Sequence, residues 1–186
     1  MSVSTMSLFF ALLTVAANVF VLVAVVLAVS ARFSEGAASA LRWLRDMVDG
    51  ASLALAAVVA LVATLGSLYL SEVANFPPCQ LCWYQRIAMY PLPLILAIAA
   101  FRRDRDVWHY VLPIALIGAA IAVYHYQLEW FPTQSHGICS AVVPCHVPPF
   151  ARKFGFISLA YMALSGFLLI ASLVWVAKQT EEIAES

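Results

Sequence analysis

Five long apolar stretches alternate with short polar segments along the chain. Unbroken helices are expected in these stretches, because backbone groups in lipid must be hydrogen-bonded within the protein. Pro91 and Pro93 should kink the third stretch. A helix needs about 20 mostly apolar residues to cross a bilayer, and five segments meet this requirement: about Leu8–Val29, Ala51–Leu70, Cys82–Phe101, Val107–Leu128 and Phe154–Ala177. The pattern predicts an all-α, polytopic membrane protein.

The composition supports the same conclusion. Of the 186 residues, 64% are hydrophobic and 11% are charged, whereas a soluble domain carries about 25% charged residues. So much apolar surface requires membrane lipid as its surroundings. The formal net charge is zero, which gives no electrostatic reason to expect a nucleic acid as partner.

The first 50 residues leave two questions open. Ala28–Ala31 weakly resembles a signal-peptide cleavage site. However, no Lys or Arg precedes the first apolar stretch, which is longer than the usual 7–15 residues of such a peptide, so we expect a retained span. After it, the segment Gly36–Asp49 is either a short interfacial helix or a solvated linker; the helix would place these apolar residues on one face: Ala37, Leu41, Leu44 and Val48.

The distribution of Lys and Arg predicts the orientation in the membrane, because cytoplasmic loops carry an excess of both residues. With five spans, three basic residues fall on one side: Arg86, Arg152 and Lys153. The other seven fall on the opposite side, which is therefore the cytoplasm: Arg32, Arg42, Arg45, Arg102, Arg103, Arg105 and Lys178. The N-terminus is then outside and the C-terminus inside.

Four cysteines form two close pairs, and both pairs lie on the predicted outer side, where disulfides form and persist. Cys79 and Cys82 follow Pro77 and Pro78, which favour a helix that begins just after them. The first turn of a helix stabilises a thiolate. Arg86 lies four residues after Cys82, on the same helix face, and adds a positive charge that favours a thiolate on Cys82. The Cys-x-x-Cys spacing of Cys79 and Cys82 is typical of redox-active cysteines.

The second pair, Cys139 and Cys145, lies in a loop of about 25 residues between the fourth and fifth spans. By itself this pair is expected to form a structural disulfide rather than a redox centre. Together the two pairs suggest a relay, because thiol–disulfide exchange can carry oxidising equivalents from one to the other. Two other interpretations stay open: structural disulfides in a scaffold or transporter fragment, and a zinc site that uses the four cysteines with His136 or His146.

The stretch from Cys79 to Pro91 reads CQLCWYQRIAMYP and resembles the signature of the DsbB/BdbC family of bacterial disulfide-bond-formation membrane proteins. Cys139, Cys145 and the later sequence FGFISL, which begins at Phe154, resemble the second half of the BdbC branch. The resemblance covers residues 51–178, which it implies form a four-helix transmembrane bundle. Residues 1–50 are then an extra N-terminal span with a short interfacial segment, and residues 179–186 a cytoplasmic tail.

The resemblance also implies a function: reoxidation of a thioredoxin-fold thiol oxidase of the DsbA or BdbD type, with electrons passed to a membrane quinone (ubiquinone or menaquinone). Cys79 and Cys82 would be the quinone-coupled pair, with Cys82 nearest the quinone. Cys139 would be attacked by the partner and resolved by Cys145. Arg86 would support the quinone.

His125, near the outer end of the fourth span, would line the quinone site by the same resemblance; an interfacial histidine in the aromatic belt is the alternative. The protein would lie in the bacterial cytoplasmic membrane, with both cysteine loops outside. No metal is expected. Two departures from the family stand out: the second cysteines are only six residues apart, where the enteric branch has a longer segment, and the first span is additional.

Overall fold

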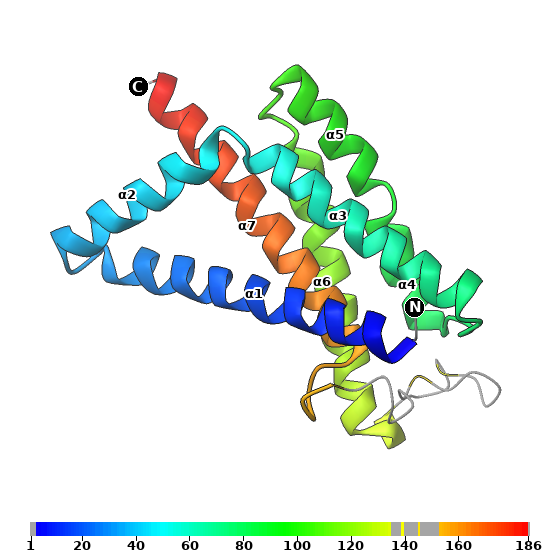
Figure 1. Ribbon diagram of the computed structural model, residues 1–186. Coiled ribbons are helices and arrows are strands. Elements are labelled where there is room, and N and C mark those ends of the chain that lie inside the picture. The colour runs from blue at the N-terminus through cyan, green and yellow to red at the C-terminus, as the bar shows by residue number, and fades with distance from the viewer. Residues whose placement is uncertain (1–2, 135–138, 140–144, 146–152, 186) are drawn as a thin grey trace.

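The structure, a computed structural model, describes residues 3–134, 139, 145 and 153–185. Its long elements are helices (Figure 1): α1 (Val3–Ser30), α2 (Glu35–Asp49), α3 (Ser52–Leu68), α4 (Gln80–Met89), α5 (Leu92–Arg102), α6 (Trp108–Trp130) and α7 (Leu159–Glu185). A π-helical turn, η1 (Tyr69–Val73), extends α3, and a 3₁₀ turn, η2 (Pro132–Gln134), follows α6.

Five helical segments are long and apolar enough to cross a membrane, as the sequence predicts: Ser4–Ser30, Ser52–Val73, Gln80–Arg102, Trp108–Trp130 and Leu159–Lys178. The protein is therefore an all-α, multi-pass membrane protein. Helix α7 continues through residues 179–185, part of the predicted cytoplasmic tail.

Two boundaries depend on local backbone chemistry. The third span is broken between α4 and α5 at Tyr90 and Pro91, as predicted, because proline has no N–H with which to continue the helical ladder. The prediction that the fifth span begins at Phe154 is wrong. Phe154 and Gly155 have φ angles of 51° and 79°, which no helix accommodates. Lys153 and Ile157 pair across this turn, and α7 begins only at Leu159.

Helix α7 lies at the centre of the bundle and packs against α1, α3 and α6 (Figure 1). Its fully buried Phe167 lies against Gly118 of α6, where a Cβ atom would be 2.4 Å from the ring. Glycine at this position therefore lets two spans approach closely, as small residues do in membrane bundles. Leu92 and Leu96 of α5 complete the same core.

The two ends of the bundle carry different chemistry. At one end lie the N-terminus of α1, the start of α4 and the start of α7 (Figure 1); we call this the cysteine end. At the opposite end Arg105 forms an ion pair with Asp49 at 3.0 Å and donates to the Ala177 carbonyl at 3.2 Å. This contact joins the end of α2 to α7 and to the segment before α6.

Helices α1 and α2 form a V that closes against α7 (Figure 1). The segment Gly36–Asp49 is thus a helix rather than a linker. Its predicted apolar face is the one that packs inward, ending in buried Val48, while Trp43 and Met47 are exposed. Helix α1 is held to α7 by a hydrogen bond of 3.1 Å from Asn18 Nδ2 to the Tyr161 hydroxyl.

Candidate functional site

The first cysteine pair is positioned by the way the chain enters α4. Asn75 adopts a left-handed conformation, with φ of 56°, and ends the preceding helical turn. Pro77 and Pro78 then keep the backbone extended. Cys79 is the N-cap of α4, and its sulfur accepts a hydrogen bond from the Cys82 backbone N–H at 3.2 Å. The predicted helix start is therefore confirmed, with Cys79 in the capping position.

Cys79 and Cys82 are free thiols whose sulfur atoms lie 2.6 Å apart. They can therefore form or break a disulfide with little movement of the backbone. Cys79 lies just before the membrane span. The hydrogen bond with the Cys82 thiol, acting against burial of the sulfur and together with His125, lowers the pKa of Cys79 to about 4. The sequence predicts a thiolate on Cys82, whereas in the structure the sulfur of Cys79 accepts the hydrogen bond from the Cys82 backbone N–H.

His125 of α6 connects the first cysteine pair to the second. Its Nε2 atom lies 3.6 Å from Cys79 Sγ and 3.1 Å from the Cys145 carbonyl oxygen. Its Nδ1 atom lies 3.1 Å from Nε2 of Gln85. If this amide nitrogen donates, Nε2 of the histidine carries the proton and faces both cysteine partners. The ring is only 2% exposed, so the alternative of an interfacial aromatic-belt residue is wrong.

The second pair forms a disulfide between Cys139 and Cys145. Cys145 is buried in a small cluster with Cys79, Leu81 and Leu128, and Cys139 packs against this cluster. Two segments that are far apart in the sequence thus place both cysteine pairs in one cluster. The two histidines suggested as zinc ligands, His136 and His146, lie outside the described residues.

Arg86 is 8% exposed and is tied to α3. Its Nε donates to Ser67 Oγ and its Nη2 to the Ser67 carbonyl, both at 2.9 Å. The guanidinium also lies 5.3 Å from the centre of the Trp83 ring and 5.9 Å from that of Tyr90. A guanidinium has five N–H donors, so three have no partner among the described residues.

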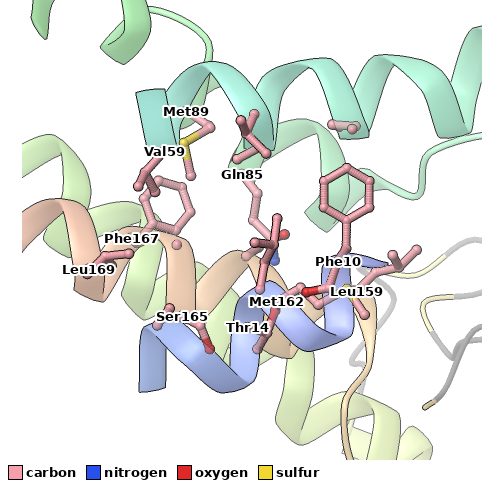
Figure 2. A pocket seen from close by; sticks show the side chains of 18 of the residues that line it. Phe10, Thr14, Val59, Gln85, Met89, Leu159, Met162, Ser165, Phe167 and Leu169 are labelled. Carbon is pink, nitrogen blue, oxygen red and sulfur yellow. Dashed lines mark hydrogen bonds between the residues drawn. The ribbon is translucent and has the colours of Figure 1, made fainter. Parts of the chain in front are cut away.

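A cavity of about 590 Å³ lies beside this arginine, between α1, α3, α4 and α7. Figure 2 shows Phe10, Gln85 and Met162 pointing toward it from three of these helices. Cys82 and Arg86 also line it. Its walls are otherwise mainly aliphatic and aromatic.

Only some of the apolar residues near the first cysteine pair line the cavity. Met89 and Tyr90 of the first cysteine signature line the cavity, whereas Trp83 and Tyr84 of the same stretch are exposed. His125 is not among the described residues that line the cavity; it lies against Cys79 instead.

The structure also adds two polar residues that the sequence argument did not single out. Ser67 holds Arg86, and Gln85 holds His125. Ser67 is a polar residue within an apolar span, which is a signal of function. Gln85 precedes Arg86 in the cysteine signature. Their partners, however, come from other helices, and only the fold reveals them.

A metal site is the alternative that the sequence left open. The disulfide removes Cys139 and Cys145 as thiolate ligands. Cys79, Cys82 and His125 do bring their ligand atoms within 4.8 Å of one another. Two thiolates on one tetrahedral zinc ion lie about 3.7 Å apart, given Zn–S bonds of about 2.3 Å. The observed sulfur distance of 2.6 Å is much shorter and suits a dithiol/disulfide couple better.

Comparison with known proteins identifies relatives of this chain. The family model described as "Disulfide bond formation protein DsbB" matches residues 50–151. Disulfide bond formation protein C of Bacillus subtilis (strain 168) is 54% identical over 115 residues, which cover 61% of this chain and 82% of the relative.

Two further relatives extend this comparison. Probable disulfide formation protein C 2 of Bacillus cereus (strain ATCC 10987 / NRS 248) is 40% identical over 141 residues, covering 76% of this chain and 98% of the relative. A probable disulfide formation protein of Coxiella burnetii (strain Dugway 5J108-111) is 41% identical over 121 residues, covering 64% of this chain and 82% of the relative. No solved structure matches.

Proposed function

The chain belongs to the DsbB family of disulfide bond formation proteins, and from this premise we propose that it reoxidises a thioredoxin-fold thiol oxidase and passes the electrons to a membrane quinone. Membership of the family makes it a disulfide oxidoreductase of the membrane. The proposal adds the electron donor, the electron acceptor and a role for each cysteine.

The first step is exchange between the partner and the second cysteine pair. A thiolate of the reduced partner attacks Cys139, and Cys145 leaves as a thiolate. The partner's second thiol then attacks the mixed disulfide and releases Cys139. The partner gains a disulfide, while Cys139 and Cys145 gain two electrons and two protons. Partly exposed Cys139 is the more accessible of the two, since Cys145 is buried.

The second step is the same exchange between the two pairs. The reduced Cys139 and Cys145 transfer two electrons and two protons to a Cys79–Cys82 disulfide. This step leaves free thiols at Cys79 and Cys82 beside a Cys139–Cys145 disulfide. His125 would donate a hydrogen bond to the thiolate that forms on Cys79.

The residues around the cavity fit a quinone. A bound quinone supplies a two-electron, two-proton acceptor. Arg86 presents N–H donors at the cavity wall to a quinone oxygen and is held in place by Ser67. Cys82 lines the same cavity. The remaining walls are apolar, as the binding of a lipid-soluble ring requires.

The observation that carries the proposal is the position of His125 between the two pairs, at 3.6 Å from Cys79 Sγ and 3.1 Å from the Cys145 carbonyl. Two neighbouring cysteine pairs can exchange disulfides, and Cys82 of the first pair lines the cavity. We further propose that the cysteine end faces the outside of a bacterial cytoplasmic membrane, where oxidised thiols persist.

The experiment traps the first step. The partner is a reduced DsbA-type oxidase whose second active-site cysteine is replaced by Ser, so that it cannot release itself from Cys139, and Cys145→Ser removes the internal thiol that could do so. With quinone present to keep Cys79 and Cys82 oxidised, Cys139 of this variant attacks the Cys79–Cys82 disulfide, and the partner's single thiol then attacks Cys139 and returns the two electrons to the first pair. A covalent complex with the partner should accumulate, seen as a band shift on a non-reducing gel. Cys139→Ser should abolish that complex. With quinone, the unaltered protein should oxidise the unaltered partner repeatedly, whereas Cys79→Ser should oxidise it for a single round.

A complex that requires Cys79 and survives the loss of Cys139 would contradict this assignment of roles. Turnover that continues in the absence of any quinone would contradict the proposed acceptor. Stoichiometric zinc on the reduced protein, lost with His125→Ala, would favour the metal-binding alternative.

A further inference from the structure

Helix α1 contributes a wall to the cavity that the family core does not supply. The family match begins at residue 50, after α1 and α2. In the Bacillus cereus relative, 98% of the sequence is matched by 76% of this chain, so about a quarter of this chain has no counterpart there. Helix α1 is also little buried: only 6% of its most apolar window is inside the protein, against 39% for the spans Gln80–Arg102 and Trp108–Trp130.

The cavity is a long groove between α1, α3 and α7, to which α4 adds lining residues around Arg86. Its lining residues on α3 and the following turn η1 extend from Leu55 to Leu70, a distance of about 22 Å at the 1.5 Å rise of a helix. On α7 they extend from Leu159 to Leu173, a similar length. Helix α1 closes the groove from Phe10 to Phe20. The groove therefore runs through most of the roughly 30 Å hydrocarbon layer.

The charged and amide side chains of the groove lie at one end, and the hydroxyls of Thr14 and Ser165 farther along donate to carbonyls of their own helices. Arg86 and Ser67 lie toward its cysteine end, beside Cys82, and α3 presents aliphatic residues such as Leu55 and Val59 farther along. A ligand that fills it has a small polar head and a long apolar tail.

Close contacts fix α1 over this groove. The ring of Phe10 lies against Gly66, where a Cβ atom would be 2.4 Å from the ring, and Gly66 is next to Ser67. About two turns deeper, Asn18 donates a hydrogen bond to Tyr161. Helix α1 therefore has a defined depth in the bundle, with Phe10 at the level of Ser67, which holds Arg86.

We propose that the groove between α1, α3 and α7 binds the isoprenoid tail of the quinone, and that α1 makes the protein selective for long-tailed quinones. This inference rests on the proposed function. Lipid chains are as apolar as the groove, so selectivity comes from packing in a preformed site rather than from escape from water. A tail held in place also positions the head beside Cys82 and Arg86.

The test introduces a larger side chain into the groove, at a position distant from the proposed site of the quinone head. Ala17 lines it seven residues beyond Phe10, about 10 Å deeper, while neighbouring Val19 is 55% exposed on the opposite face. Ala17→Phe should weaken binding of a long-tailed quinone about tenfold, equivalent to about 1.4 kcal/mol, and leave a tail-less quinone unaffected. Val19→Phe, the matched control, should change neither.

Binding is measured directly, by quenching of intrinsic tryptophan fluorescence during titration with each quinone; Trp83 lies beside Arg86. Quinone extracted from the purified variants gives a second readout. An unchanged ratio of long-tail to tail-less affinity in Ala17→Phe, or equal weakening of both, overturns the inference. If Ala17→Phe does not fold, Ala17→Leu is judged by the same ratio. If the unaltered protein binds neither quinone, the proposed function itself fails.

Discussion

Cys79 is the residue whose environment makes the sharpest chemical prediction. The Cys82 thiol, followed by His125, lowers its pKa to about 4 despite burial of the sulfur. A thiolate predominates above its pKa, so the alkylation rate of Cys79 should stay constant from pH 8 down to about 5 and fall only as the pH approaches 4. An ordinary cysteine loses half its reactivity near pH 8.5.

Two substitutions isolate this effect, because each leaves Cys79 as the single free thiol beside the Cys139–Cys145 disulfide. Cys82→Ser retains an O–H donor and should keep the midpoint of the alkylation profile well below 8.5. Cys82→Ala removes the donor and should shift the midpoint upward. Identical midpoints in the two variants would show that the hydrogen bond from residue 82 does not stabilise the thiolate. The rates are followed with iodoacetamide and mass spectrometry.

At this scale the sequence predicted residue types better than contacts. The first cysteine pair and Arg86 could be found because their chemistry depends on local spacing: Cys82 lies three positions after Cys79, and Arg86 four positions after Cys82. The contact of Arg86 with Ser67 could not be found, since it joins residues 19 positions apart on different helices. The hydrogen bond of Gln85 to His125 spans 40 positions for the same reason.

At the scale of helices, packing depends on a few small residues. Gly118→Ala places a methyl group 2.4 Å from the ring of Phe167, which is fully buried and cannot move aside easily. We expect a loss of about 1–3 kcal/mol from overpacking, partly offset by the better helix propensity of alanine, about 1 kcal/mol. Thermal unfolding in detergent, followed by circular dichroism, should show a lower Tm.

Gly166→Ala in α7 is the matched control, because its Cβ meets only Met89 Cε at an ordinary 3.7 Å and its Tm should be unchanged or higher. Phe167→Leu should restore part of the stability lost in Gly118→Ala. A Gly118→Ala protein as stable as the Gly166→Ala protein would mean that α6 and α7 separate without cost.

Apolar length predicted all five spans, and the absence of a proline N–H predicted the break at Pro91. The start of α7 was missed because Phe154, Phe156 and Ile157 are apolar enough to continue a span. Two of the residues in this turn have positive φ angles, Phe154 and Gly155. Hydropathy measures composition and contains no information about backbone angles, so a turn made of apolar residues escapes it.

At the scale of the whole molecule, five spans place the termini at opposite ends of the bundle, with both cysteine pairs at the end where α1 begins (Figure 1). Lys153 donates to Ser4 at this end, and Arg105 joins Asp49 at the other. The fold thus separates the seven predicted cytoplasmic basic residues from the cysteines. The geometry alone is the same for either orientation in the membrane.

The positive-inside rule decides between the two orientations. By their positions between the five predicted spans, seven Lys and Arg residues fall on the side opposite the cysteines and three on the cysteine side, so the cysteine end should face outward. In intact cells treated with a reductant, a membrane-impermeant maleimide should label Cys139, which is partly exposed. Asp104→Cys provides a reporter for the other side, because residue 104 is exposed there and the substitution keeps every basic residue. That reporter should be labelled only after permeabilisation. The reverse pattern would put the cysteines in the reducing cytoplasm, where a protein-disulfide oxidase could not keep its partner oxidised.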